Sequence, residues 1–436
     1  MSLSSAFRSL WSCEIVSKEL TAEGCDPNRP PRLTIRDICS TLMVLTIFAP
    51  LSVLKSLCRR HKCAKDIKGL VGHELLMCLG RRLPISLIQQ NIYPRSGSLL
   101  KKSQRYAQVP FQVAQQVRKS DFAGYWVYRD ISVEACPQDA DLVLFHLHGG
   151  GYVMGHPLDN ATELLLIAEI LTRRNYTVAI FSLEYTPAPR APLPTQHNQA
   201  LAAYAWLTTE LHIDPSQLYL MGESAGGHLI LSLLLELHRR THLGTMKQQQ
   251  QQQQQQPPLR KPAAAIMVSP WVNLKPCGPD ARANSEEIDA RSAAFKQVLE
   301  RFSQLVLQGS PPETERLHGN FAVRVSERGS WKDILPTQTW VSAGTAEPLF
   351  RFDTEGFVEA ARADGAQLSF ELAEGREHVW QTLEARKQEK QFLAMAFGED
   401  DPTLMSGYRH IAEIIVSWLR ESGNQRTKCH PCNPKG

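Results

Sequence analysis

The sequence carries little net charge for its length. Its formal charge is +4 over 436 residues, and no run of basic residues is interleaved with aromatic side chains. A protein that binds nucleic acid needs such a basic footprint, so the composition argues against that class of function. Hydrophobic residues make up 43% of the chain, which is enough for one large single-core domain with appendages.

The cysteines lack regular spacing. The chain has 10, scattered along its length, and half of them precede residue 64. They therefore predict no disulfide framework. Cys429 and Cys432 form a CxxC pair near a polar terminus, which is weak evidence for a metal or redox site.

A stretch without any charge lies near the N-terminus. Residues 1–37 are polar and mixed, whereas residues 38–54 contain no charged side chain, and basic residues crowd between positions 55 and 65. The stretch is short for a bilayer span, which needs about 20 residues, and it contains Pro50. We predict that residues 38–57 form a membrane anchor or a helix that lies in the membrane interface. The alternative is an amphipathic helix that packs on the domain.

The chain then divides into a connector and a large domain. Residues 58–120 have the pattern of helices and loops, and we expect a helical cap or connector there. Within residues 121–423, short apolar runs alternate with helical stretches, which predicts a mostly parallel central sheet with helices on both faces. The runs are nearly continuous in apolar residues, as expected for strands buried on both faces. The six runs are DLVLFHLHGGG, YTVAIFSLEY, QLYLMGESAGG, PAAAIMVSPWV, TQTWVSAGTAE and QLSFELAEGREH.

Three segments fall outside this alternation. Residues 247–260 contain a glutamine tract followed by two prolines, and such a tract cannot bury apolar area, so we predict a disordered loop. This loop falls at the N-terminal edge of the sheet, opposite the edge where such folds bind ligands. Residues 275–330 form a long connection, which we interpret as a cap-like insertion that covers a pocket. Residues 424–436 are expected to be a disordered tail.

The segment YLMGESAGGHL places a serine between two apolar elements. Gly222, Ser224 and Gly226 form a GxSxG sequence directly after a predicted strand and before a predicted helix. A nucleophile on such a tight turn projects its oxygen above the sheet, and the glycines allow strand and helix to approach closely. The N-terminal amides of the helix also favour negative charge at this point. We therefore predict that Ser224 is a catalytic nucleophile.

A second glycine cluster follows an earlier strand, in HLHGGGYVMG. Consecutive glycines let backbone N–H groups point to one place, as an oxyanion hole requires. We assign the N–H groups of Gly150 and Gly151 as donors together with that of Ala225, and we include Gly149 with less support. A phosphate loop would need a Gly-Lys-Ser/Thr sequence, which this segment lacks.

A serine nucleophile needs a base and an acid, which we expect after the last two strands. His378 follows the final predicted strand, in ELAEGREHVW. Glu347 and Asp353 follow the strand before it, in WVSAGTAEPLFRFD. Glu347 is closer to the strand end and is our choice, with Asp353 as the alternative. Either carboxylate can orient the imidazole and stabilise its cation.

In this order, the HGGG, GESAGG, AEPL and EH segments resemble the hormone-sensitive lipase family of α/β-hydrolases, which includes arylacetamide deacetylases and fungal steryl deacetylase-like proteins. The match covers about residues 120–420. EYTPAPRAPLPTQ is similar to a further family segment, although Pro187 replaces Leu and Arg190 replaces Glu. The chain also has Glu347 where the family more often has Asp. The resemblance implies an α/β-hydrolase fold with a helical cap.

These observations predict a serine carboxylesterase or deacetylase for lipophilic small-molecule esters, acting through an acyl-enzyme. We expect it to need no metal or organic cofactor. The same triad also permits an amidase, a formamidase or an acyltransferase. A third alternative is a hydrolase-fold protein that binds a ligand without catalysis. The plant gibberellin receptors, which resemble this family but lack the catalytic histidine, act in this way. The presence of His378 argues against this alternative.

The side of the membrane stays open. Basic residues after the apolar stretch favour a cytosolic domain, whereas the resemblance implies the endoplasmic reticulum and its luminal side. Asn160 and Asn175 each begin an Asn-x-Thr triplet and are candidate glycosylation acceptors.

Overall fold

The computed structural model describes most of the chain. The described residues are 33–59, 67–90, 100, 103–107, 114–130, 132, 136–248, 259–275, 290–347 and 349–423. The predicted tail at 424–436, Cys429, Cys432 and residues 249–258 of the predicted glutamine-rich loop lie outside them.

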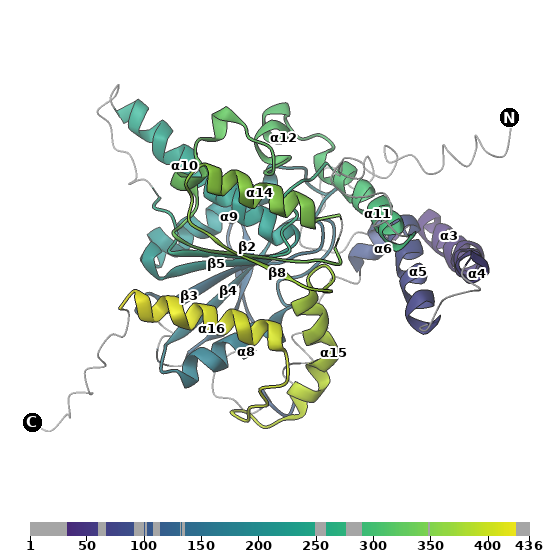
Figure 1. The fold of residues 1–436 in the computed structure, drawn as a ribbon, viewed down its shortest axis with the longest axis horizontal. Helices are drawn as coiled ribbons and strands as arrows, with labels where there is room; N and C mark the ends of the chain where they lie inside the picture. The colour runs from purple at the N-terminus through teal and green to yellow at the C-terminus, as the bar shows by residue number, and fades with distance from the viewer. Residues whose placement is uncertain are drawn as a thin grey trace, which may run out of the picture.

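An eight-stranded sheet forms the centre of the molecule (Figure 1). Its order is β1-β2-β4-β3-β5-β6-β7-β8; β2 pairs antiparallel with β1 and with β4, and the other neighbours are parallel. The strands are β1 Gln115–Arg118, β2 Ala123–Arg129, β3 Leu142–Leu147, β4 Val178–Glu184, β5 Leu218–Glu223, β6 Ala264–Val268, β7 Gln338–Gly344 and β8 Ser369–Ala373. The six predicted apolar runs are β3 to β8, which confirms the mostly parallel sheet.

Helices cover both faces of the sheet. In Figure 1, α9, α10 and α14 lie above it, and α8, α15 and α16 lie below it. The helices are α3 Ile35–Met43, η1 Val44–Phe48, α4 Ala49–Arg59, α5 Ile67–Arg82, α6 Ile85–Gln90, η3 Pro137–Asp139, α8 Ala161–Arg173, α9 Thr195–Ala205, η4 Trp206–Glu210, η5 Pro215–Gln217, α10 Ala225–Gln248, α11 Ala290–Leu307, α12 Pro312–His318, η6 Ser326–Arg328, α13 Trp331–Ile334, α14 Arg351–Ala363, α15 Trp380–Ala394 and α16 Ser406–Glu421.

The predicted boundaries need three corrections. The connector expected over 58–120 ends in a strand, because β1 pairs with β2 through polar, mostly exposed residues that give no apolar signal. The apolar N-terminal helix begins at Ile35 rather than at residue 38 and runs to Arg59 through a π-helical turn. Helix α10 continues to Gln248, so the first residues of the predicted 247–260 loop are helical. The predicted insertion at 275–330 contains α11 and α12.

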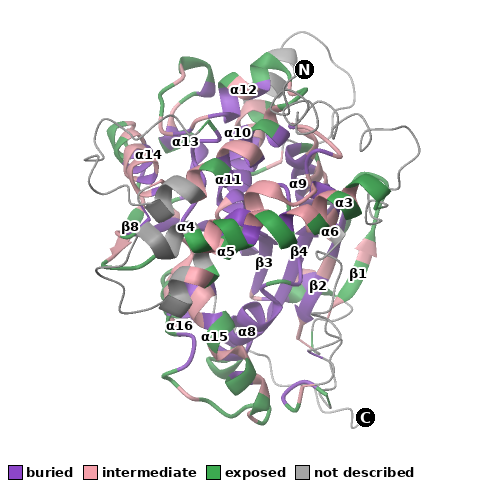
Figure 2. Ribbon diagram, turned by 90° about the vertical axis from the view of Figure 1, so that its right-hand side faces the viewer, coloured by how far each residue is buried: buried purple, intermediate pink, exposed green. Residues whose placement is uncertain are grey.

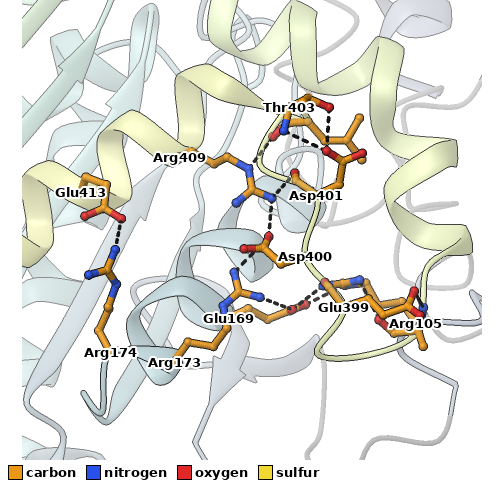
Figure 3. A network of polar contacts seen from close by, with 12 residues as sticks. Arg105, Glu169, Arg173, Arg174, Glu399, Asp400, Asp401, Thr403, Arg409 and Glu413 are labelled. Atoms are coloured by element: carbon orange, nitrogen blue, oxygen red, sulfur yellow. Dashed lines mark hydrogen bonds and ion pairs between the residues drawn. The ribbon is translucent and has the colours of Figure 1, made fainter.

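A buried cation joins the connector to the lower layer of helices (Figure 3). Arg105 is almost fully buried and forms a bidentate pair with Glu169 of α8, at 2.8 and 2.5 Å. Its guanidinium also donates to the carbonyl oxygens of Ala396 and Glu399. These partners satisfy the donors of a cation removed from water. The contacts fix residues 103–107 against the sheet domain.

Candidate active site

Ser224 stands on the turn between β5 and α10. Its backbone φ is +51°, in the left-handed region that is strained for a side chain. The glycines around it permit this turn, because a Cβ at Gly226 would lie 1.8 Å from the carbonyl oxygen of Leu147. A Cβ at Gly222 would lie 2.7 Å from the backbone of Gly226. Strand and helix therefore approach as closely as the predicted nucleophile turn requires.

The structure brings the three predicted triad residues together. His378 Nε2 lies 3.0 Å from Ser224 Oγ, and His378 Nδ1 lies 2.7 Å from Glu347 Oε2. The carboxylate is buried, whereas the imidazole is 18% exposed. The acid that contacts His378 is Glu347, while the alternative, Asp353, lies in the first turn of α14. Because carboxylate oxygens only accept, Nδ1 carries a proton and Nε2 faces the serine as an acceptor.

Further contacts fix the acid and the imidazole. Ser269, at the end of β6, donates through its hydroxyl to Glu347 Oε1 at 3.0 Å, and the N–H of Gly344 donates to the same oxygen. The Ser269 hydroxyl also accepts from the N–H of Val379 at 3.1 Å, beside His378. Sequence reasoning missed Ser269. Its position directly after the strand run AAAIMV was the only signal that could have identified it.

The glycine-rich loop after β3 lies beside this serine. A Cβ at Gly149 would be 3.0 Å from the carbonyl oxygen of Glu223, and Gly150 and Gly151 have φ of +108° and +61°. A Cβ at Gly150 would lie 2.0 Å from the Met154 carbonyl oxygen, so this position requires glycine. Within the described part of the chain, no protein acceptor pairs with the N–H groups of Gly150, Gly151 and Ala225. These amides are available to an oxyanion.

Two buried tyrosine side chains, Tyr185 and Tyr152, fix the glycine-rich loop through hydrogen bonds. The Tyr185 hydroxyl donates to the carbonyl oxygens of His148 and Gly149, at 3.0 and 3.2 Å. The hydroxyl of Tyr152 lies 2.8 Å from His228 Nδ1. On the other side of the ring, His228 Nε2 lies 2.7 Å from the backbone carbonyl oxygen of His318. Burial lowers the pKa of His228 to about 3. The neutral ring therefore donates through Nε2 and accepts the Tyr152 proton, which links the loop to α10.

A second polar cluster lies in the sheet beneath Ser224. Glu223 is buried and accepts from His146 Nε2 at 3.1 Å, from Asn160 Nδ2 at 3.1 Å and from the Tyr408 hydroxyl at 3.2 Å. His146 Nδ1 lies 2.8 Å from Ser182 Oγ. Asn160 is 5% exposed and fully engaged here, so the folded protein does not offer it as a glycosylation acceptor.

Among the described residues, no group of three or more His, Cys, Asp and Glu side chains has the geometry to hold a metal ion. The polar groups at the edge of the sheet are instead a serine, an imidazole, a carboxylate and unpaired amides. This set fits acyl transfer at a carbonyl carbon, where a nucleophile, a base and oxyanion donors are needed.

Comparison with known proteins gives consistent results. Residues 144–382 match the family model described as alpha/beta hydrolase fold. An acetyl-hydrolase of Streptomyces hygroscopicus is 26% identical over 54% of this chain and 67% of its own length. Hormone-sensitive lipase of Mus musculus is 33% identical over 23% of this chain and 13% of its own length.

The sheet and its helices also match solved structures. The crystal structure of an esterase/lipase from an uncultured bacterium aligns with a TM-score of 0.52 and with 22% identity. The alignment covers 79% of this chain and 96% of that one. At 22% identity this structural similarity shows the fold alone, and that fold agrees with the predicted α/β-hydrolase class.

Proposed function

The chain belongs to the α/β-hydrolase family, in the group similar to hormone-sensitive lipase, and from this premise we propose how it acts. It is a carboxylic ester hydrolase, and Ser224, His378 and Glu347 are its catalytic triad. The observation that carries the proposal is the pair of hydrogen-bond contacts at His378, 3.0 Å to the serine oxygen and 2.7 Å to the glutamate.

The first half of the reaction forms an acyl-enzyme. Ser224 Oγ attacks the ester carbonyl carbon while His378 Nε2 takes its proton, and Glu347 stabilises the resulting imidazolium. The N–H groups of Gly150, Gly151 and Ala225 donate to the oxyanion of the tetrahedral intermediate. The intermediate collapses when His378 returns the proton to the leaving alcohol.

The second half hydrolyses the acyl-enzyme. A water molecule replaces the alcohol, and His378 takes its proton as the water oxygen attacks the acyl carbon. The same amides stabilise the second oxyanion. Collapse of this intermediate breaks the bond to Ser224, returns the proton to the serine and releases the acid.

The surroundings support a lipophilic ester as substrate. The ring of Phe350 stacks on His378 at a centroid distance of 3.9 Å, and the ring of Phe295 lies 6.1 Å from it. Relatives are named acetyl-hydrolase and ethyl acetate hydrolase, which supports a short acyl group. The apolar helix Ile35–Leu54 supports a membrane location, and the resemblance to deacetylases favours the endoplasmic reticulum.

The test compares the full chain with its Ser224→Ala variant on p-nitrophenyl acetate, butyrate and decanoate. We expect turnover by the parent, and background rates for the variant on all three esters. A fluorophosphonate probe should label the parent at Ser224 and leave the folded variant unlabelled. Turnover or labelling that persists in Ser224→Ala would reject the triad.

A further inference from the structure

The N-terminal helix presents a broad apolar surface to solvent. Figure 2 shows α3, α4 and α5 on the face toward the viewer, with much of α3 and part of the described half of α4 exposed. By length and composition, Ile35–Leu54 is the one helix of the described chain that could cross a membrane. We call the outward side of this helix the apolar face. Its exposed large hydrophobic residues are Leu33, Ile35, Ile38, Leu42, Leu45, Ile47, Leu51 and Leu54.

The opposite side of the same helix packs on the protein. Val44 and Ala49 are buried, and the guanidinium of Arg82 in α5 lies 4.3 Å from the ring centroid of Phe48. A helix that crossed the bilayer in this packing would carry a cation near the middle of the hydrocarbon layer, where charge is costly. The packing therefore fits a helix that lies along the membrane surface with one side in lipid.

Helix α5 connects the apolar face to the catalytic domain. Arg301 of α11 donates to the carbonyl oxygens of Gly80 and Leu83, at 2.8 and 2.6 Å. A Cβ at Gly80 would lie 3.2 Å from Val298 of α11, so the two helices are in close contact. The apolar face is thus joined to α11 through a packed, hydrogen-bonded helix pair.

Helix α11 in turn contacts the active site. Its Phe302 ring would lie 2.6 Å from a Cβ at Gly151, in the glycine-rich loop, and its Phe295 ring lies 6.1 Å from the His378 ring. In the neighbouring α6, Gln89 donates to the carbonyl oxygen of Val153 in the same loop, at 3.1 Å. Helices α6 and α11 therefore lie against the edge of the sheet that holds Ser224, and α11 is joined to the apolar face through α5.

The charge of the segment matches a phospholipid surface. Residues 55–65, which follow the apolar helical stretch in the chain, contain five lysine and arginine residues and no acidic residue, whereas residues 33–54 carry only Arg36 and Asp37, whose charges cancel. Each basic residue near an anionic membrane contributes attraction of about 1 kcal/mol. A protein partner would require no such basic run next to the apolar helix in the sequence, so lipid is the occupant that both features favour.

We propose that residues 33–54 lie flat in the headgroup region of an anionic membrane without crossing it, and that this turns the active-site edge toward the lipid. The substrate class is then an ester dissolved in the membrane, which enters from the lipid side. This second statement rests on the proposed esterase function, whereas the docking geometry does not.

The test uses the full chain and vesicles of phosphatidylcholine, with and without phosphatidylserine. Leu42 is 56% exposed on the apolar face, and Val323 is 55% exposed elsewhere, which makes Val323→Glu the matched control for Leu42→Glu. We expect Leu42→Glu to weaken flotation with vesicles about tenfold, and Val323→Glu to float like the parent. Phosphatidylserine should strengthen flotation of the parent.

Activity separates the two statements. Leu42→Glu should hydrolyse soluble p-nitrophenyl acetate at the parental rate and lose most activity on p-nitrophenyl decanoate dissolved in vesicles. Unchanged flotation of Leu42→Glu would overturn the docking proposal. If flotation behaves as expected but the parent hydrolyses neither ester, the proposed function fails and the docking geometry stands.

The membrane topology of the N-terminal helix provides an independent test of the proposal. The full chain with an N-terminal tag is synthesised in the presence of sealed microsomes and then treated with protease. A helix lying in the interface leaves tag and catalytic domain on the same side, so both are digested or both are protected. Digestion of one and protection of the other would overturn the proposal in favour of a spanning helix.

Discussion

The described part of the chain contains two hydrogen-bonded Ser–His–Glu arrangements, one at the edge of the sheet and one inside it. Ser224, His378 and Glu347 lie at strand ends. The second set is Ser182, His146 and Glu223, with contacts of 2.8 and 3.1 Å. We call these the edge set and the buried set. Their residue types and distances are nearly the same, so these alone do not identify an active site.

The two sets differ in what surrounds the serine and the imidazole. His378 is 18% exposed, and its serine has a left-handed φ and neighbouring unpaired amides. His146 is fully buried, and it faces Ser182 directly across two parallel strands. No substrate reaches a serine in the middle of a sheet. Reactivity therefore depends on access and oxyanion donors, while the buried set contributes hydrogen bonds to the core.

Replacing the two histidines should separate the two roles most strongly. His378→Ala removes the proton acceptor, and we expect kcat to fall about 10⁶-fold with little change in thermal unfolding. His146→Ala removes a donor to the buried Glu223 carboxylate, and we expect the free energy of unfolding to fall by about 2–4 kcal/mol. The readouts are p-nitrophenyl butyrate kinetics and urea unfolding. A folded His146→Ala protein without activity would contradict the division.

The two glutamates provide a milder version of the same comparison. Glu347→Gln cannot stabilise the imidazolium and favours the wrong tautomer, so kcat should fall about 10⁴-fold. Glu223→Gln places amide hydrogens against the donors from His146, Asn160 and Tyr408, which should cost about 1–3 kcal/mol of stability. Kinetics and unfolding of both purified variants are the measurements. Equal losses of kcat would show that both carboxylates serve the reaction.

Oxyanion donors are what the buried set lacks, so disturbing them should have the next largest effect. Gly150→Ala meets the Met154 carbonyl oxygen and displaces the loop, and we expect kcat to fall about 10²–10³-fold. Gly398→Ala is the control, since Gly398 also has positive φ, at +87°, but nothing lies within 4 Å of its Cβ position. Full activity in Gly150→Ala would place the oxyanion hole elsewhere.

Local sequence patterns were sufficient for the six strands β3 to β8 and for the residues that follow them. Parallel strands bring their C-terminal ends to one edge, so the residues after β5, β7 and β8 could be assigned to one site from order alone. The contact of His378 with Glu347 rather than with Asp353 agrees with the choice of the residue nearest the strand end.

Long-range contacts had no such signal. Ser269 contacts Glu347 across 78 positions, and Tyr408 contacts Glu223 across 185. Neither pair shares a motif, and a lone serine or tyrosine in an apolar run is normally a core residue. The strands β1 and β2 were also absent from the predicted runs, and the polar residues of β1 have no alternating pattern. Sequence therefore identifies groups at strand ends but not the side chains that fix them.

The smallest expected effect is a pH dependence of the free energy of unfolding, caused by Glu163 beside the buried set. Burial raises the pKa of Glu163 to about 8, and its Oε2 has no partner in the described part of the chain. Below about pH 4.5 this carboxyl is neutral in both folded and unfolded chains, so it costs no stability. As pH rises to about 8, the unfolded chain ionises while the folded chain keeps the proton, so the free energy of unfolding falls.

Glu163→Gln should remove this loss of stability at high pH. Urea unfolding at pH 5 and pH 8 should therefore show a stability gain that is larger at pH 8, with kcat unchanged because, among the described residues, Glu163 makes no hydrogen bond or ion pair with Ser224, His378 or Glu347. An equal gain at both pH values would mean that Glu163 is ionised in the folded protein, and that the core beneath Ser224 tolerates a second carboxylate charge beside Glu223.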